Sequence, residues 1–209
     1  MHLFSRTITL SGSPRRALPW AFAMTEYVNA HVDYDVSLWS YNFGQPIGTV
    51  SWSAVVESQA SFVAASAGLL ADDGYLDLLE QAADLVATAG VDQLRQLIHG
   101  EPGGPAPIGA IATVTNATAM VDRMVEAVGW SVDIAEHITQ STGAPIAVLT
   151  SAFGQMGEIA WIGVQPDLDS SAAIGEKLPA DTGYLSRMTA TKDLFIQGSG
   201  QLSQLTRIA

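Results

Sequence analysis

The chain has 209 residues, of which 48% are hydrophobic and only 14% are charged, and its formal net charge at pH 7 is -12. A chain of this length forms one large domain or two small ones and buries a sizeable core. The excess of acidic residues repels phosphate backbones, so we expect no nucleic-acid partner. Cysteine is absent, which excludes disulfides, thiolate nucleophiles and cysteine-ligated metals.

The N-terminal residues MHLFSRTITLSG lack the basic start and the long apolar core of a signal peptide. The apolar stretches are far shorter than the ~20 residues that a membrane span needs. We therefore expect a soluble, cytoplasmic protein without a membrane span. The scarcity of charge leaves two interpretations, a monomer with a surface rich in small residues or a homo-oligomer in which another subunit covers part of the surface. We favour the homo-oligomer.

The first half of the chain is organised as a series of short elements. Residues 2–10 are apolar and β-branched, which is typical of a strand, and Trp20, Met24, Val28 and Val32 recur at helical spacing. The remaining segments are predicted in chain order as strands over 35–43 and 49–57, helices over 58–70 and 75–86, and a short closing helix over 91–98.

The second half repeats the first. Trp20 and the string Phe43-Gly44-Gln45 recur as Trp130 and Phe153-Gly154-Gln155, and the string GYL at 74–76 recurs at 183–185. The repeat predicts strands over 108–115, 145–153 and 158–164, with helices over 119–141, 170–195 (broken) and 201–208. Between the halves, GEPGGPAP over 100–107 is typical of a linker. We expect one module over residues 1–99 and a second over 108–209.

Each module is thus predicted as β-α-β-β-α, an α+β arrangement of the ferredoxin-like kind. An open sheet of this type covers one face with helices and leaves the other bare. Two tandem modules that pack sheet to sheet bury both bare faces. The expected fold is therefore a single-chain pseudo-dimeric α/β barrel with a cavity between the halves.

The hairpin LWSYNFGQPIGTVSWSAVVES followed by LLADDGYLDLL, and its counterpart VLTSAFGQMGEIAWIGVQPD with LPADTGYLSRM, resemble the dimeric α/β-barrel superfamily. This group includes antibiotic-biosynthesis-type monooxygenases, stress-responsive A/B-barrel proteins and NIPSNAP proteins. The resemblance covers nearly the whole chain, once per module. It implies the fold and a cavity, but no single activity, because members differ in their chemistry.

Members that degrade haem are similar in an Asn, Trp and His set on the first strand, the hairpin and the second helix. Trp52 and Trp161 match the tryptophan, but the first strand of module one has no Asn and neither second helix has a His. Related members bind haem through a His, for which His137 is the internal helix candidate of module two. We expect no cofactor, with haem as the alternative, and no metal site, since no histidines share a ligand spacing.

Two residues are candidates for catalysis. Glu158 lies inside a strand and is either a base in the cavity or an ordinary solvated carboxylate. His137 is either a proton carrier that faces the cavity or a packed residue of the helix surface.

Three basic residues cluster near the N-terminus and are candidates for binding an acidic ligand. Arg6 lies on the first strand, and Arg15 and Arg16 lie at the start of the next helix, where a cation is disfavoured unless an anion is near. Salt bridging within this acidic chain is the alternative. The aromatic residues of the hairpins are candidates for lining a cavity, with core packing as the alternative, and they are Trp39, Tyr41, Trp52 and Trp161.

Two functions fit these features. The first is a small-molecule-binding barrel protein whose cavity takes an apolar or aromatic compound, with a cofactor-independent oxygenation or isomerisation as its reaction. The second is a non-enzymatic, oligomeric scaffold or accessory protein of a larger assembly, favoured by the sparse charge and the missing catalytic set.

Overall fold

The computed structural model describes residues 1–101, 106–191 and 193–209. Module one consists of β1 (His2–Thr9), α1 (Pro14–His31), β2 (Val36–Phe43), β3 (Thr49–Val56), α2 (Gln59–Leu70), α3 (Asp73–Ala82) and β4 (Val91–His99). Module two consists of β5 (Ile111–Thr118), a 3-10 turn (Val121–Arg123), α4 (Met124–Thr142), β6 (Ile146–Phe153), β7 (Glu158–Gln165), α5 (Leu168–Lys177), a 3-10 turn (Leu178–Ala180), α6 (Thr182–Thr189) and β8 (Gln201–Arg207). The four central residues of the expected linker, 102–105, lie outside the described residues.

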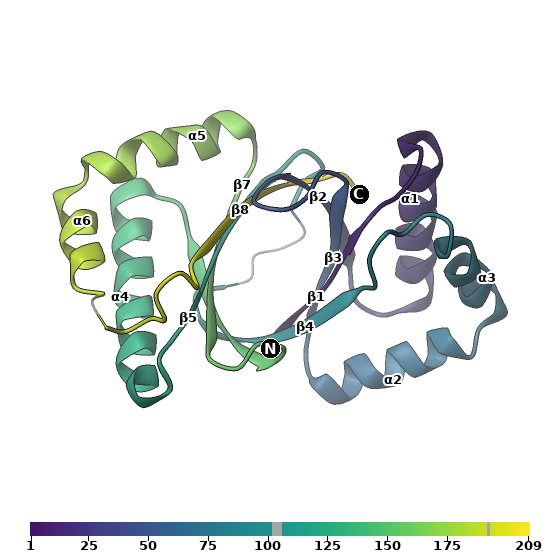
Figure 1. Cartoon of the computed structure of the whole chain (residues 1–209), viewed down its shortest axis with the longest axis horizontal. Helices are drawn as coiled ribbons and strands as arrows, with labels where there is room; N and C mark the ends of the chain where they lie inside the picture. Colours follow the sequence, from purple (N-terminus) through teal and green to yellow (C-terminus); the bar gives the residue numbers. More distant parts are fainter. Residues whose placement is uncertain (102–105, 192) are drawn as a thin grey trace.

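The strands form one closed antiparallel barrel in the order β1-β3-β2-β8-β5-β7-β6-β4. Each module contributes a four-stranded sheet, and the sheets join where β2 pairs with β8 and β4 pairs with β6. In Figure 1 helices α1 to α3 cover one side of the barrel and α4 to α6 cover the opposite side. The expected single-chain α/β barrel built from two ferredoxin-like modules is therefore confirmed.

The closing element of each module differs from the expectation. Residues 91–98 and 201–208 were predicted as short helices, and both predictions are wrong, because these segments form strands β4 and β8. Each strand is hydrogen-bonded on both edges, β4 to β1 and β6, and β8 to β2 and β5. Pairing with partners that are distant in sequence overrides the helix preference of Gln, Leu and Arg.

Alternation along the strands separates an outer face under the helices from an inner face in the barrel. The outer face holds the core of each module, where Trp20 meets Trp52 edge-on at 6.0 Å between ring centroids and Trp130 meets Trp161 at 5.9 Å. The indoles of Trp20 and Trp130 donate to the carbonyls of Leu78 and Arg187, the equivalent residues of the repeat. The helical layers are thus packed from side chains that the repeat preserves.

The repeated string Gly-Tyr-Leu has a steric explanation. Gly74 and Gly183 lie near the starts of α3 and α6, and neither has a positive φ, so they are not left-handed helix stops. A Cβ on Gly74 would lie 2.5 Å from the Tyr27 hydroxyl, and a Cβ on Gly183 would lie 2.6 Å from Cε1 of His137. Glycine at these positions lets the first helix of each module approach the third. Within the part of the chain that is described, no helix has both the length and the apolarity to cross a membrane.

Candidate functional site

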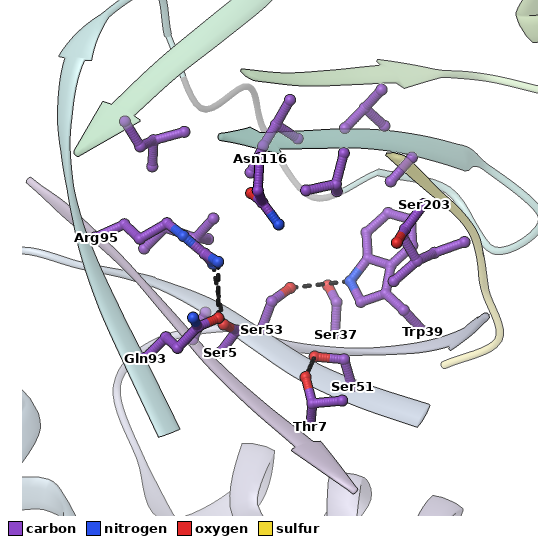
Figure 2. Close-up of a pocket in the computed structure, with 18 of the residues that line it drawn as sticks. Ser5, Thr7, Ser37, Trp39, Ser51, Ser53, Gln93, Arg95, Asn116 and Ser203 are labelled. Atoms are coloured by element: carbon purple, nitrogen blue, oxygen red, sulfur yellow. Dashed lines mark hydrogen bonds between the residues drawn. The ribbon is translucent and has the colours of Figure 1, made fainter. Parts of the chain in front are cut away.

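The inside of the barrel is hollow. A cavity of about 950 Å³ lies between the two sheets, and its wall combines apolar side chains with many hydroxyl and amide groups. Figure 2 shows these polar groups converging on the cavity from strands of both modules. The polar lining includes Ser5, Thr7, Ser37, Ser51, Ser53, Gln93, Arg95, Asn116 and Ser203. A cavity of this size is large enough for a ligand of several rings.

On the wall of module one, four threonine and serine hydroxyls form two pairs. The hydroxyls of Thr7 and Ser51 lie 3.1 Å apart, and those of Thr9 and Thr49 lie 3.2 Å apart. The Ser51 hydroxyl also lies 3.2 Å from the backbone carbonyl oxygen of Arg6, to which it can donate. These bonds link β1 to β3 and give each of the four hydroxyls a partner.

The part of the wall where β4 of module one meets module two differs because it carries a buried ion pair. Arg95 on β4 donates from Nε and Nη2 to Oε1 of Glu158 on β7, at 2.9 and 2.8 Å. The side chains are 7% and 9% exposed, so the pair lies in a low-dielectric environment where its charges must compensate each other. Arg95 also donates to Oε1 of Gln93 at 2.7 Å and to the Ser5 hydroxyl at 3.4 Å.

Glu158 retains one free oxygen. Both hydrogen bonds that it accepts from the described residues end on Oε1, and Oε2 accepts none from them. The residue lines the main cavity and also an adjoining polar pocket of about 210 Å³. Oε2 can therefore accept a hydrogen bond or a proton from a molecule in the cavity.

Two aromatic residues of β2 line the cavity, as their alternation predicts. The indole of Trp39 donates to the Ser53 hydroxyl at 2.9 Å, which fixes the ring against the wall. Burial raises the pKa of Tyr41, and the Thr7 hydroxyl partly offsets that shift. Together they give module one an aromatic wall, in which a hydrogen bond holds Trp39 in place.

The other two predicted aromatics do not reach the cavity. Trp52 and Trp161 alternate to the outer face, where Trp52 donates to the Thr25 hydroxyl at 2.8 Å and Trp161 to the Ser131 carbonyl at 3.2 Å. They belong to the helix–sheet cores. Core packing, the alternative stated for them above, describes their surroundings.

The three predicted arginines are also outside the cavity lining. Arg6 points to the outer face of β1 and makes a bidentate ion pair with Asp92, with both bonds at 2.7 Å. Arg15 and Arg16 are exposed on the first turn of α1. The structure therefore brings none of these arginines to Glu158.

His137 lies in the helical layer on α4. Its Nε2 lies 3.0 Å from Oδ2 of Asp181, which caps the start of α6 through the amides of Gly183 and Tyr184. In module one Tyr27 donates to Asp72 in the same way, and Asp72 caps α3. This shared arrangement places His137 in a helix-capping contact and away from Glu158.

Sequence analysis did not predict three of the polar residues that line the cavity. Arg95 was assigned to a helix, and Gln93 with it, so neither was placed beside Glu158. One signal was present, because Arg95 is the first lysine or arginine after Arg16 in an otherwise acidic stretch. Asn116 lies just beyond the strand predicted over 108–115 and was not a candidate residue, although it stands on β5 and lines the cavity.

Comparison with solved structures identifies the fold. A candidate monooxygenase from Fusobacterium nucleatum superposes with a TM-score of 0.74 at 10% identity, over 100% of this chain and 92% of that one. An anthrone oxidase-like protein superposes with a TM-score of 0.67 at 13% identity, again over 100% and 92%. This chain has the duplicated dimeric α/β-barrel fold. No model of a protein family and no curated protein sequence matches the chain.

A heme-degrading enzyme from Listeria monocytogenes shares the fold, with a TM-score of 0.56 at 7% identity over 99% of both chains. The residue set that the resemblance to haem-degrading members implies can be compared with this barrel. Among the described residues, the histidine that lines the cavity is His2, at the start of β1. Asn116 and Trp161 occupy opposite faces of the sheet, so the Asn, Trp and His set does not assemble.

Proposed function

We propose that the protein binds a small, largely apolar or aromatic molecule inside the barrel and removes a proton from it with Glu158. The observation that carries the proposal is a buried carboxylate with one free oxygen, facing a cavity of about 950 Å³. A base that is excluded from bulk water acts on weak carbon or phenol acids more effectively than one in solution.

The reaction that suits this arrangement is a cofactor-independent oxygenation or an isomerisation. In both, a C–H bond breaks, the proton moves to Oε2 of Glu158, and the electron pair remains on the substrate as an enolate. With oxygen as co-substrate, anthrone plus O₂ gives anthraquinone plus water. In an isomerisation the proton returns to another carbon. Arg95 is the positioning residue, because it orients the carboxylate through Oε1.

Binding is tested by filling the cavity. Val114 lines the cavity, whereas Val125 is 86% exposed on α4, so Val114→Trp and Val125→Trp make the same change in volume inside and outside the barrel. Calorimetric titration with 2-naphthol is expected to show binding to the wild type and to Val125→Trp but not to a folded Val114→Trp. Equal binding by all three would overturn the cavity as the binding site.

Catalysis is tested with anthrone under air, followed by the formation of anthraquinone. Glu158→Gln keeps the shape of the side chain and removes its basicity, so we expect a loss of about 10² to 10⁴ in rate. The matched control is Glu176→Gln on the surface of α5, which is expected to keep the wild-type rate. A Glu158→Gln variant as active as the wild type would exclude Glu158 as the base.

The absence of a resident cofactor is part of the proposal, and haem is its alternative. Haemin is titrated into the wild type and into Val114→Trp and followed by its Soret absorption. We expect the two titrations to be alike, with no saturable shift that depends on an open cavity. A stoichiometric shift that this variant removes would favour haem binding in the cavity.

A scaffold role is the second candidate, favoured by one observation. The β2–β3 and β6–β7 hairpins both expose apolar side chains near their tips, namely Phe43, Ile47, Phe153 and Met156. Such tips are suited to contacts between subunits, in keeping with the expected homo-oligomer. Sedimentation velocity at micromolar concentration tests this, and a monomer would count against it.

A further inference from the structure

The pseudo-twofold relation between the modules isolates one unusual polar group. Thr7 on β1 pairs in register with Ser51 on β3, and Asn116 on β5 pairs in register with Ala160 on β7. These are equivalent positions of the repeat. The hydroxyls of Thr7 and Ser51 form a hydrogen bond with each other, whereas the methyl group of Ala160 can neither donate a hydrogen bond to the amide of Asn116 nor accept one from it.

The amide oxygen of Asn116 consequently has no partner within the described part of the chain. Its Oδ1 is buried and accepts no hydrogen bond from the described residues. Figure 2 shows the amide extending from its strand into the cavity, across from Trp39. A buried amide oxygen without a partner is costly, by about 1–3 kcal/mol, so its presence points to a group that is supplied from outside the chain.

The surroundings of Asn116 define the chemistry of that group. Asn116, Gln155, Glu158 and Gln201 line both the main cavity and the polar pocket of about 210 Å³ beside it. Glu158 is already neutralised by Arg95, and the other acidic side chains of the lining are Asp35 and Glu101. An anionic ligand is therefore disfavoured, and an uncharged polar head is favoured.

We infer that Asn116 anchors the ligand, and that the ligand is a neutral ring compound with a hydrogen-bond donor and acceptor side by side, as in a lactam or cyclic amide. A carboxamide complements such a group with one donated and one accepted bond. The apolar rings would then lie toward Trp39 and Leu149, and the polar head toward the smaller pocket. This inference rests on the proposed function, since it names the class of molecule that occupies the same cavity.

The test compares two probes of nearly equal shape. 2-Quinolone has an N–H donor beside its carbonyl, and N-methyl-2-quinolone keeps the rings and the carbonyl but lacks the donor. Calorimetric titration of the wild type is expected to show at least about tenfold tighter binding of 2-quinolone, because the N–H satisfies Oδ1 of Asn116. The variant Asn116→Leu is expected to lose that preference while it still binds N-methyl-2-quinolone.

Thermal unfolding without ligand provides a second readout. Asn116→Leu removes a polar group without a partner, so we expect its Tm to equal or exceed that of the wild type. The control Thr25→Val, on α1 in the helical layer and outside the cavity lining, removes a satisfied hydroxyl and is expected to lower the Tm and keep the preference for 2-quinolone. A lower Tm for Asn116→Leu together with an unchanged preference would assign Asn116 a structural role and overturn the inference.

The outcomes separate the two proposals. If both probes bind the wild type equally and Val114→Trp blocks both, the cavity binds ligands but Asn116 does not select them, and the inference fails alone. If 2-naphthol binds but neither quinolone does, the ligand class is wrong and the cavity proposal stands. If none of the three binds, both proposals fail.

Discussion

At the scale of single residues, the cavity depends on the ion pair between Arg95 and Glu158. The two residues come from different modules and meet inside the barrel across β6, with Arg95 nearly removed from solvent. In the repeat, Glu158 takes the place of Thr49 and Arg95 takes the place of Ser203. The ion pair is therefore an asymmetric feature of a symmetric frame, to which each module contributes one residue.

The pair makes a specific prediction for stability. Glu158→Ala leaves the Arg95 guanidinium buried without its carboxylate, and we expect a loss of about 3–5 kcal/mol in the free energy of unfolding. The double variant Arg95→Met with Glu158→Leu removes both charges, and it is expected to be about as stable as the wild type or more so. Urea unfolding of the three proteins measures this, and an equally unstable double variant would contradict the argument.

At the scale of elements, the helix starts show how the repeat conserves geometry while it changes chemistry. The caps of α3 and α6 each combine an aspartate, a glycine and a side chain from the first helix of the module. That side chain is Tyr27 in one module and His137 in the other. The glycine is needed because the ring lies where its Cβ would be.

This close approach predicts opposite effects for two glycine variants. Gly183→Ala places a methyl group against the ring of His137, and we expect a loss of about 1–3 kcal/mol. Gly175→Ala, in the interior of α5, meets no atom within 4 Å and is expected to gain about 0.5–1 kcal/mol from helix propensity. Chemical denaturation of both variants checks the prediction, and a stabilising Gly183→Ala would refute the steric explanation.

The cap of α6 also predicts a dependence on acid. The backbone amide of Tyr184, followed by the His137 ring, holds the pKa of Asp181 below its usual value. A lowered pKa in the folded state adds stability above the unfolded value near pH ~4, and this contribution is lost as the pH falls through the folded value. Asp181→Asn keeps a capping oxygen but does not titrate.

The stability difference between the wild type and Asp181→Asn is therefore expected to be largest above pH ~5 and to shrink as the pH falls below ~4. Thermal unfolding of both proteins at a series of pH values that spans this range measures the difference. A constant difference over the whole range would mean that Asp181 titrates alike in the folded and unfolded chains.

The features that the sequence alone predicts are those of elements with a local pattern. The internal repeat and the alternation on β2 are local patterns. The repeat predicts the barrel fold that the structure has, and the alternation places Trp39 and Tyr41 on one face of β2, the face that lines the cavity. The strand β4 has no such pattern, because QLRQL suits a helix as well as a strand. The pairing of this segment with β1 and β6 decides that Arg95 lies on a strand, and those partners are distant in the sequence.

At the scale of the whole molecule, closure of the barrel joins the modules. Each four-stranded sheet has two edges, β2 and β4 in module one and β8 and β6 in module two, and every edge is paired with the other module. A separate module would expose both edges of its sheet and its inner face, on which one residue of the ion pair would be left without the other. The modules that we propose from the repeat are thus structurally complete only as a pair.

This arrangement predicts the behaviour of the two halves as separate chains. Residues 1–101 and 106–209, when co-expressed, are expected to associate one to one, because β2–β8 and β4–β6 pairing and burial of Arg95 with Glu158 act together. Each half alone is expected to self-associate or aggregate through its open edges. Size-exclusion chromatography with mass detection measures this. Two stable, monomeric halves would show that closure is not required. Because Glu158→Ala in the second half leaves Arg95 of the first half unpaired, this variant is expected to weaken the complex by at least about tenfold.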